Sequence, residues 1–255
     1  MSPRKSSYNW HEELEIEHTF RSPRALPLNQ SKFWLSGHFR LFLSHLSSFK
    51  EKTAQLQRAL REYGISAFVA HEDIAPAKEW QDEIEKALFS MDALVVILTP
   101  GFKESNWTDQ EVGVAVGRDV LIIPIRKGLN PYGFIAKFQG LQAEGKTIAQ
   151  VANALFQILA SHPKTKPCIA DALIEQVLVS SSLTEARGKL ELFRRIETLP
   201  EQYLEKLRDN LSRNEVLSAA DEFRALLNEI LLERGLPELT KENPLEDLSD
   251  DDIPF

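Results

Sequence analysis

One short segment of the sequence, residues 105–111, combines an aromatic side chain with a carboxylate at helical spacing. Trp107 and Glu111 are four positions apart, so they share one face if this segment is a helix. A second segment, residues 71–79, is long for a loop between a strand and a helix and leads directly into Trp80. The two segments together predict a pocket that is faced by an aromatic ring and an acid.

Signatures of other common chemistries do not occur in the sequence. No glycine-rich phosphate-binding loop follows a predicted strand, and neither a His-Glu-x-x-His nor a Cys-x-x-Cys motif is present. The six histidines are scattered at positions 11, 18, 38, 45, 71 and 162. His45 and His71 could meet above a sheet, but two neighbouring histidines without a cysteine or a third ligand are more often hydrogen-bonded or packed. We therefore expect no metal and no bound cofactor.

The elements that must position these residues follow from the apolar pattern. Continuous apolar stretches predict strands at 39–44, 65–70, 93–98 and 121–125, with amphipathic helices between them and a final helix that ends near residue 159. Pro124 places the last of these strands near an edge or a strand end. The alternation predicts an α/β fold with a doubly wound parallel sheet, whose ligands bind in the loops that follow the carboxyl ends of the strands.

Composition divides the chain into four regions. We expect an irregular lead-in at 1–35, the α/β domain at 36–160, a small all-α region at 169–236 after a proline-bounded linker, and a disordered acidic tail at 237–255. Residues 238–255 hold seven acids and one lysine, whereas the whole chain has a net charge of −8. The remainder is thus close to neutral and offers no basic stripe, which argues against direct binding of nucleic acid.

The sequence carries no signal for export or membrane insertion. Its first residues lack the apolar core of a signal peptide, and its longest apolar run, residues 93–98, is too short to span a bilayer. Cys168 is the sole cysteine, which excludes an intramolecular disulfide. We expect a cytoplasmic protein without a membrane contact.

A series of short motifs runs through the α/β segment. They are Phe42-Leu-Ser-His45, Gly64-Ile65, Phe68, Asp73-Ile74, Trp80 with Ile84 and Ala87-Leu88, Leu98-Thr-Pro100, and Ser105-x-Trp-x-x-x-Glu111. In this order they resemble the Toll/interleukin-1 receptor (TIR) domain of the bacterial kind, which implies a flavodoxin-like sheet. The sequence departs from that family at Arg40, where an acid is usual, and at Pro76-Ala77-Lys78, where many members have glycine. Because of these departures, the mobility of this loop and the contacts between domains do not follow from the resemblance.

The resemblance implies one of two functions. Some members of the family only assemble signalling complexes, whereas many bacterial and plant members cleave NAD⁺ at the nicotinamide–ribose bond. Catalytic members carry an essential glutamate on the third helix, commonly four residues after a tryptophan. By resemblance, Glu111 is the catalytic residue of an NAD⁺ nucleosidase, and its carboxylate would stabilise the oxocarbenium-like centre that forms as the bond breaks.

The resemblance also implies which residues contact NAD⁺, which is the substrate and not a cofactor. The implied contacts are Trp80, which would stack on nicotinamide or adenine, Ser44 and His45 after the first strand, Asp73 on the next loop, and Trp107. The alternatives are that Glu111 is an ordinary solvated residue and that the two tryptophans are core aromatics.

The tail forms a second motif. Its residues are Asp250, Asp251, Asp252, Ile253, Pro254 and Phe255. They resemble the acidic tip of bacterial single-stranded DNA-binding proteins, which docks repair and replication enzymes. The resemblance implies a docking peptide for proteins that bind such tips, and the alternative is an acidic solubilising tail.

These observations lead to one hypothesis with two rivals. We expect a bacterial NAD⁺ hydrolase or cyclase, an effector of defence or stress that is activated by self-association as a homo-oligomer through TIR contacts. The first rival is a non-catalytic TIR adaptor that acts through protein–protein interaction. The second is a synthase that makes a cyclic or conjugated ADP-ribose as a signal.

Overall fold

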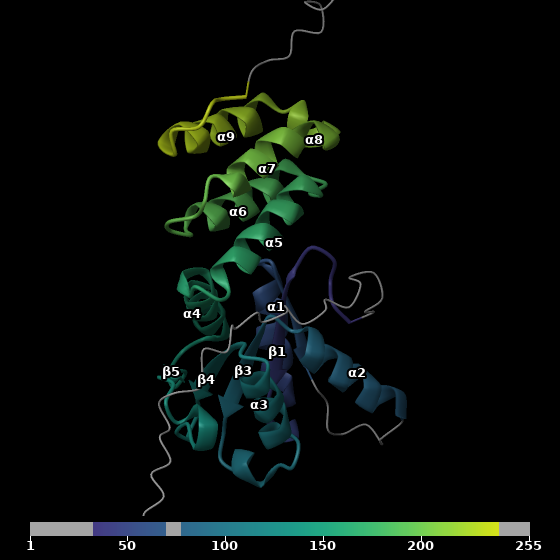
Figure 1. Cartoon of the computed structure of the whole chain (residues 1–255), viewed down its shortest axis with the longest axis vertical. Helices are drawn as coiled ribbons and strands as arrows, with labels where there is room; N and C mark the ends of the chain where they lie inside the picture. Colours follow the sequence, from purple (N-terminus) through teal and green to yellow (C-terminus); the bar gives the residue numbers. More distant parts are fainter. Residues whose placement is uncertain (1–32, 70–77, 240–255) are drawn as a thin grey trace, which may run out of the picture. The chain divides into compact units, whose positions relative to one another are not determined.

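Five parallel strands form a sheet at the centre of the described chain, in the order β2-β1-β3-β4-β5. The structure is a computed structural model that describes residues 33–69 and 78–239 (Figure 1). The strands are β1 (Phe39–Ser44), β2 (Ile65–Val69), β3 (Ala93–Leu98), β4 (Leu121–Arg126) and β5 (Leu141–Gln142). Every pairing between neighbours is parallel, as a doubly wound fold requires.

The strands send alternate side chains into two hydrophobic cores. In β1, Leu41 and Leu43 belong to one core and Phe42 belongs to the other. β3 is buried along its whole length, because strands on both edges and helices on both faces exclude water from it. The continuous apolar stretches thus predicted strands correctly, and for β1 and β3 they predicted the same bounds.

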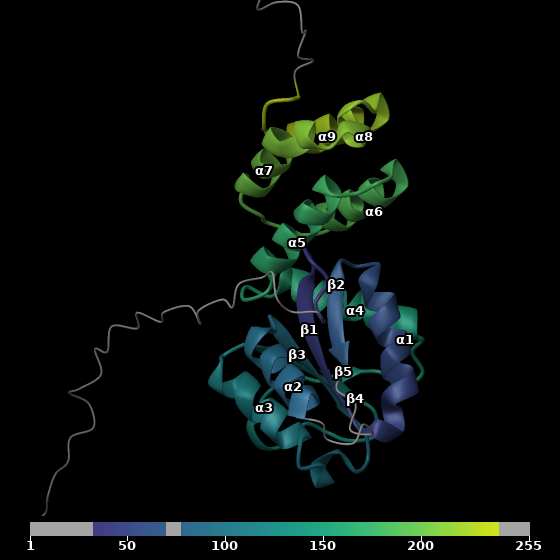
Figure 2. The same ribbon diagram turned by 90° about the vertical axis from the view of Figure 1, so that its right-hand side faces the viewer.

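Helices cover both faces of the sheet. The helices are α1 (Lys50–Arg61) and α4 (Ile148–Ser161) on one face, and α2 (Lys78–Ser90) and α3 (Thr108–Gly117) on the other. Figure 2 shows α1 on one side of the strands and α2 and α3 on the opposite side. Leu60 and Phe156 fill the first core, and Leu88 and Val112 fill the second. This arrangement confirms the predicted α/β fold class.

The edge of the sheet beyond β4 was not predicted in full. No local pattern predicted β5, because a strand of two residues is too short to show a periodicity. It pairs with Ile125 and Arg126. Gly140 lies so close to β4 that an added Cβ would be 2.7 Å from Arg126 Cγ. Pro124 pairs with Val96 of β3 on one side. On its other side β5 pairs only with Ile125 and Arg126, so Pro124 has the place near an edge that was expected.

The end of the predicted lead-in packs on the sheet. Trp34 is only 9% exposed, and its indole Nε1 donates to Ser90 Oγ at 2.8 Å. Its ring lies against Phe33 and Phe68, with centroids 5.4 and 6.0 Å away. Phe33 and Trp34 therefore belong to the second core, and the earlier residues of the lead-in lie outside the described chain.

The predicted all-α region contains helices joined by turns, and no strand, within its described length. Its helices are α5 (Lys166–Leu178), α6 (Leu183–Arg194), α7 (Gln202–Asn210), α8 (Glu215–Ser218) and α9 (Asp221–Glu233). Short 3-10 turns are η1 (Ser47–Phe49), η2 (Phe102–Glu104), η3 (Gly133–Ile135) and η4 (Leu211–Arg213). α5 begins inside the expected linker, since Pro167 suits the first turn of a helix. No helix within the described residues has both the length and the apolarity needed to cross a bilayer.

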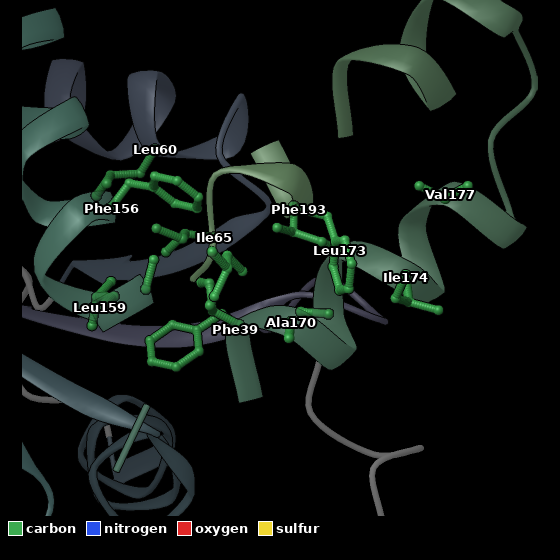
Figure 3. Close-up of a cluster of buried hydrophobic side chains, with 14 of the residues drawn as sticks. Phe39, Leu60, Ile65, Phe156, Leu159, Ala170, Leu173, Ile174, Val177 and Phe193 are labelled. Atoms are coloured by element: carbon green, nitrogen blue, oxygen red, sulfur yellow. The ribbon is translucent and has the colours of Figure 1, made fainter. Parts of the chain in front are cut away.

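One hydrophobic core runs from the sheet into these helices (Figure 3). Phe39 of β1 and Ile65 of β2 belong to the same cluster as Leu173 of α5 and Phe193 of α6, and all four are at most 1% exposed. The compositional boundary between 160 and 169 does not interrupt this cluster. Beyond Leu239, the predicted tail lies outside the described residues.

Polar side chains of α5 and α6 complete the same junction. Gln176 Nε2 donates to the carbonyls of Gly37 and Gly64 at 3.1 and 3.2 Å. Lys189 Nζ donates to the carbonyls of Arg61 and Glu62 at 3.1 and 2.9 Å. Because the last carbonyls of a helix have no partner within it, Lys189 satisfies the carboxyl end of α1 from a different part of the chain.

Candidate active site

The loops after three strands meet at the carboxyl edge of the sheet. A Cβ at Gly101, after β3, would lie 3.4 Å from Leu46, which follows β1. The backbone N–H of Lys127, after β4, donates to the Leu98 carbonyl at 3.0 Å. This edge is where an open parallel sheet binds its ligands. The loop after β2 lies outside the described residues.

Glu111 is brought to this edge by the first turn of α3. The chain turns after β3 at Gly101, whose φ of +90° is the left-handed conformation that glycine tolerates. Thr108 Oγ1 then donates to the Phe102 carbonyl at 2.9 Å and fixes the start of α3 against η2. Because α3 returns antiparallel to β3, its first turn lies at the carboxyl edge.

The Glu111 side chain is buried. It is 4% exposed, so the alternative of a solvated surface residue does not hold. It lies in the first turn of α3, near the partial positive charge of the helix amino end. Burial of a glutamate is unusual, because glutamate side chains are almost never fully buried unless they are paired.

Ser44 lies on the same face of the sheet as α3. It follows Phe42 by two residues, and Phe42 belongs to the core beneath α2 and α3. Side chains two apart in a strand point to the same face. Ser44 is fully buried, and its hydroxyl makes no hydrogen bond to any of the residues that the structure describes.

Thr99 is a second buried hydroxyl at this edge, which the sequence analysis did not single out. It directly follows β3 and is 7% exposed. Its Oγ1 also has no hydrogen-bond partner within the described chain. Buried hydroxyls are normally paired, so two such groups at one edge need an explanation, and a bound ligand is one. Its place directly after a strand in Leu98-Thr-Pro100 was the signal that could have found it.

His45 is held by the backbone beside Ser44. It is 4% exposed, and its Nδ1 lies 3.1 Å from the Leu43 carbonyl. Because a carbonyl only accepts, we assign a proton to Nδ1. The ring is thus placed at the end of β1, as expected, with a fixed orientation.

Trp107 does not share the burial of Glu111. It forms the amino-terminal cap position of α3 and is 40% exposed, so it is not a core aromatic. Trp80 lies in the first turn of α2, but its side chain is outside the described part. The same holds for Asp73 and for the tail residues 250–255.

Next to Glu111, an ordered polar contact ties α3 to the segment before η3. The Tyr132 hydroxyl donates to Asp109 Oδ1 at 2.7 Å, and Lys103 Nζ lies 4.7 Å from the centre of the Tyr132 ring. Burial and the carboxylate of Asp109 raise the pKa of Tyr132 above its ordinary value. Tyr132 is therefore neutral near pH 7, and its hydroxyl donates to the Asp109 carboxylate.

The departure at Arg40 lies at the opposite edge. The Arg40 backbone N–H donates to Asp92 Oδ2 at 2.8 Å, and its Nη2 lies 2.5 Å from Oδ1. Arg40 is the second residue of β1, and Asp92 directly precedes β3. This ion pair therefore joins the amino ends of two neighbouring strands and does not alter the candidate site.

The comparison with protein families agrees with the fold. A family model described as TIR domain matches residues 41–155. A solved TIR domain of the Toll-related receptor TRR-2 from Hydra magnipapillata is similar, with 24% identity and a TM-score of 0.38, over 47% of this chain and 96% of that one. No curated protein sequence matches the chain. The segment that the family model matches extends from β1 into α4 and includes Ser44, Thr99 and Glu111. Residues 41–155 of the chain are therefore those of a TIR domain.

Proposed function

We propose that the TIR domain cleaves NAD⁺ at the nicotinamide–ribose bond, with Glu111 as the catalytic residue. The observation that carries this proposal is the burial of Glu111, which is 4% exposed in the first turn of α3. A carboxylate in this position would face a ligand held beyond the carboxyl ends of the strands. The buried Ser44 and Thr99 hydroxyls at the same edge support the proposal, because NAD⁺ offers ribose and phosphate oxygens to such donors.

The chemistry suits one carboxylate. The bond between ribose C1′ and the nicotinamide nitrogen breaks, and its electron pair leaves with nicotinamide. Nicotinamide is cationic in NAD⁺ and departs neutral, so no acid is needed. Positive charge develops at C1′, where the ionised Glu111 stabilises it. Attack by water then gives ADP-ribose and a proton, whereas attack by a group of the same nucleotide gives a cyclic product.

The decisive experiment follows nicotinamide release from NAD⁺ by the purified full chain, at a protein concentration high enough for self-association. We expect Glu111→Gln, which keeps the size of the side chain, to reduce turnover by about 100-fold, the loss typical of one transition-state electrostatic contact. Glu144→Gln, at an exposed position outside the site, is the matched control. Equal turnover of the Glu111 variant and the wild type would rule Glu111 out as the catalytic residue.

A non-catalytic adaptor is the second candidate function, and two exposed aromatics favour it. Phe134 of η3 is 72% exposed and Trp107 is 40% exposed, and both lie on segments linked through the contact between Tyr132 and Asp109. Exposed aromatic side chains are common at protein–protein interfaces. We expect Phe134→Ser to weaken self-association in sedimentation velocity. If the protein is an adaptor, Phe134→Ser should still weaken self-association. Neither the wild type nor Glu111→Gln should then cleave NAD⁺ in the self-associated state.

The cellular role and the tail are further parts of the proposal. We propose a cytoplasmic effector of bacterial defence or stress, whose residues 250–255 dock proteins that bind the tips of single-stranded DNA-binding proteins. Removal of residues 253–255 should abolish the capture of those proteins, and equal capture would refute the docking role. Mass spectrometry of the products would distinguish ADP-ribose from a cyclic or conjugated form.

A further inference from the structure

A pocket lies away from the candidate active site, on the face of the sheet that α1 and α4 cover. It has a volume of about 340 Å³, which is within the range of small-molecule sites. Its walls come from α4, the first residue of α5 and the connection between α6 and α7. The lining residues are Phe156, Gln157, Ala160, Ser161, Lys166, Arg195, Glu197 and Thr198.

Arg195 is held in one orientation at this pocket. Its Nη2 donates to Asn153 Oδ1 at 2.8 Å, and its guanidinium carbon lies 5.0 Å from the centre of the Phe156 ring. A guanidinium placed over an aromatic face is attracted by the ring and loses less freedom when it binds an anion. Neither contact neutralises its charge, because both partners are uncharged.

Lys166 is the second cation of the pocket. Its Nζ donates to the carbonyls of Glu197 and Thr198, each at 3.4 Å. Hydrogen bonds of this length are weak. Thr198 has a φ of +50°, a conformation that a β-branched residue rarely adopts. Lys166 also begins α5, so the partial positive charge of that helix end adds to its own.

These two cations differ from their neighbours in sequence. Arg194 pairs with Glu229 and Glu233, and Lys164 pairs with Asp119. Among the residues that the structure describes, neither Lys166 nor Arg195 has a carboxylate within ion-pair distance. Glu197 brings one opposing charge, and both Glu197 and Arg195 are exposed to water, whereas Lys166 is half-buried. Two cations and one acid leave the lining residues with a net positive charge.

We propose that this pocket binds a small molecule through a phosphate or pyrophosphate group, which Lys166 and Arg195 contact together. Arginine matches two phosphate oxygens with its planar fork, and lysine supplies a point charge. The bound group would connect α4 of the TIR domain with α5 and the connection between α6 and α7. The proposal does not depend on cleavage of NAD⁺, because the pocket and Glu111 lie on opposite faces of the sheet.

The test is a calorimetric titration of the full chain at low salt with orthophosphate, pyrophosphate and ADP in separate arms. Pyrophosphate should bind, and Lys166→Gln combined with Arg195→Gln should weaken binding at least about tenfold through the loss of two charge-assisted contacts. Binding should also weaken as salt screens the pocket. A stronger response to ADP than to pyrophosphate would identify the ligand as a nucleotide.

The matched control removes the same charge elsewhere. Lys146→Gln combined with Arg187→Gln changes two exposed residues that do not line the pocket, and we expect it to keep the affinity. Far-ultraviolet circular dichroism confirms that each variant is folded, and Lys166→Gln alone serves if the double variant is not. The absence of binding in every arm would overturn the proposal. Equal weakening by the pocket and control variants would also overturn it, since the response would then reflect net charge alone.

Discussion

Two regions of this molecule bury polar side chains, and they differ in whether those side chains are hydrogen-bonded within the described residues. At the junction between the sheet and α5–α6, Gln176 and Lys189 are 5% and 9% exposed, and each donates to backbone carbonyls of the TIR domain. At the carboxyl edge, the hydroxyls of Ser44 and Thr99 are as deeply buried but have no partner within the described residues. Paired polar groups stabilise a fold, whereas buried hydroxyls without a partner at the proposed ligand-binding edge could bind a ligand.

The largest effect should come from breaking the junction at Lys189. Lys189→Ala leaves the carbonyls of Arg61 and Glu62 without their donor, and we expect a loss of about 3 kcal/mol in the free energy of unfolding. Urea unfolding measures it. Arg187→Ala, at an exposed position on the same helix, is the control and should stay near the wild type. A Lys189 variant as stable as this control would show that the junction does not depend on the contact.

A second test fills the space at Gly64. Its φ is +76°, and an added Cβ would lie 2.9 Å from Gln176 Nε2. Gly64→Ala should therefore cost about 2 kcal/mol, through backbone strain and displacement of Gln176. Gly188→Ala, on α6 with no atom within 4 Å of the added Cβ, should be neutral or slightly stabilising. Thermal unfolding of the two variants distinguishes a specific clash from a general intolerance of alanine.

Two serines on neighbouring strands sharpen the comparison. Ser66 accepts a hydrogen bond from the Leu35 backbone N–H at 3.0 Å, and Ser44 has no such contact within the described chain. Ser44→Ala should change the free energy of unfolding by less than about 0.5 kcal/mol and lower NAD⁺ cleavage about tenfold. Ser66→Ala should do the reverse, with a stability loss of about 1 kcal/mol and unchanged cleavage. Identical behaviour of the two variants would contradict the functional reading of the carboxyl edge.

The smallest effect concerns pH. Burial, with the nearby charges of Lys189 and Arg61, lowers the pKa of His38 below 6.5, and the Ser36 carbonyl and Glu185 oppose this only in part. The unfolded state then binds the proton more readily, so the free energy of unfolding should fall as pH drops below about 6.5 towards the folded-state pKa. His38→Gln should show a shallower decrease between pH 7 and 5. Parallel decreases in the two proteins would exclude His38 as the titrating group.

Much of the fold could be predicted because local patterns of apolar residues indicate its strands and helices. β3 reads as a continuous apolar run, and α4 carries its apolar residues at helical spacing, since each face must be buried. The position of the candidate site followed from the fold class, because parallel strands that alternate with helices place their carboxyl ends together. Glu111 was predicted from a motif that resembles the TIR family. No local pattern in the sequence indicated that its side chain is buried.

Other features depend on contacts between distant residues. Trp107 and Glu111 have the spacing of one helix face, yet one is 40% and the other 4% exposed, because Trp107 lies at the cap position where the chain enters α3. Thr99 is one of many threonines in the sequence, and only packing shows that its hydroxyl is buried without a described partner. Exposure is a property of what surrounds a residue, so spacing alone did not determine it.

The sequence by itself determined β1 to β4, most helices and the edge at which we expect a ligand to bind, since local periodicity records which face of each element is buried. Only the tertiary structure joined the all-α region to the sheet, for Lys189 and Arg61 are 128 positions apart and no short pattern links them. The same holds for the pocket of Lys166 and Arg195, where one cation from α5 and one from the connection between α6 and α7 converge. Long-range packing decides which polar groups find partners, and in this protein that distinction separates the junction from the candidate active site.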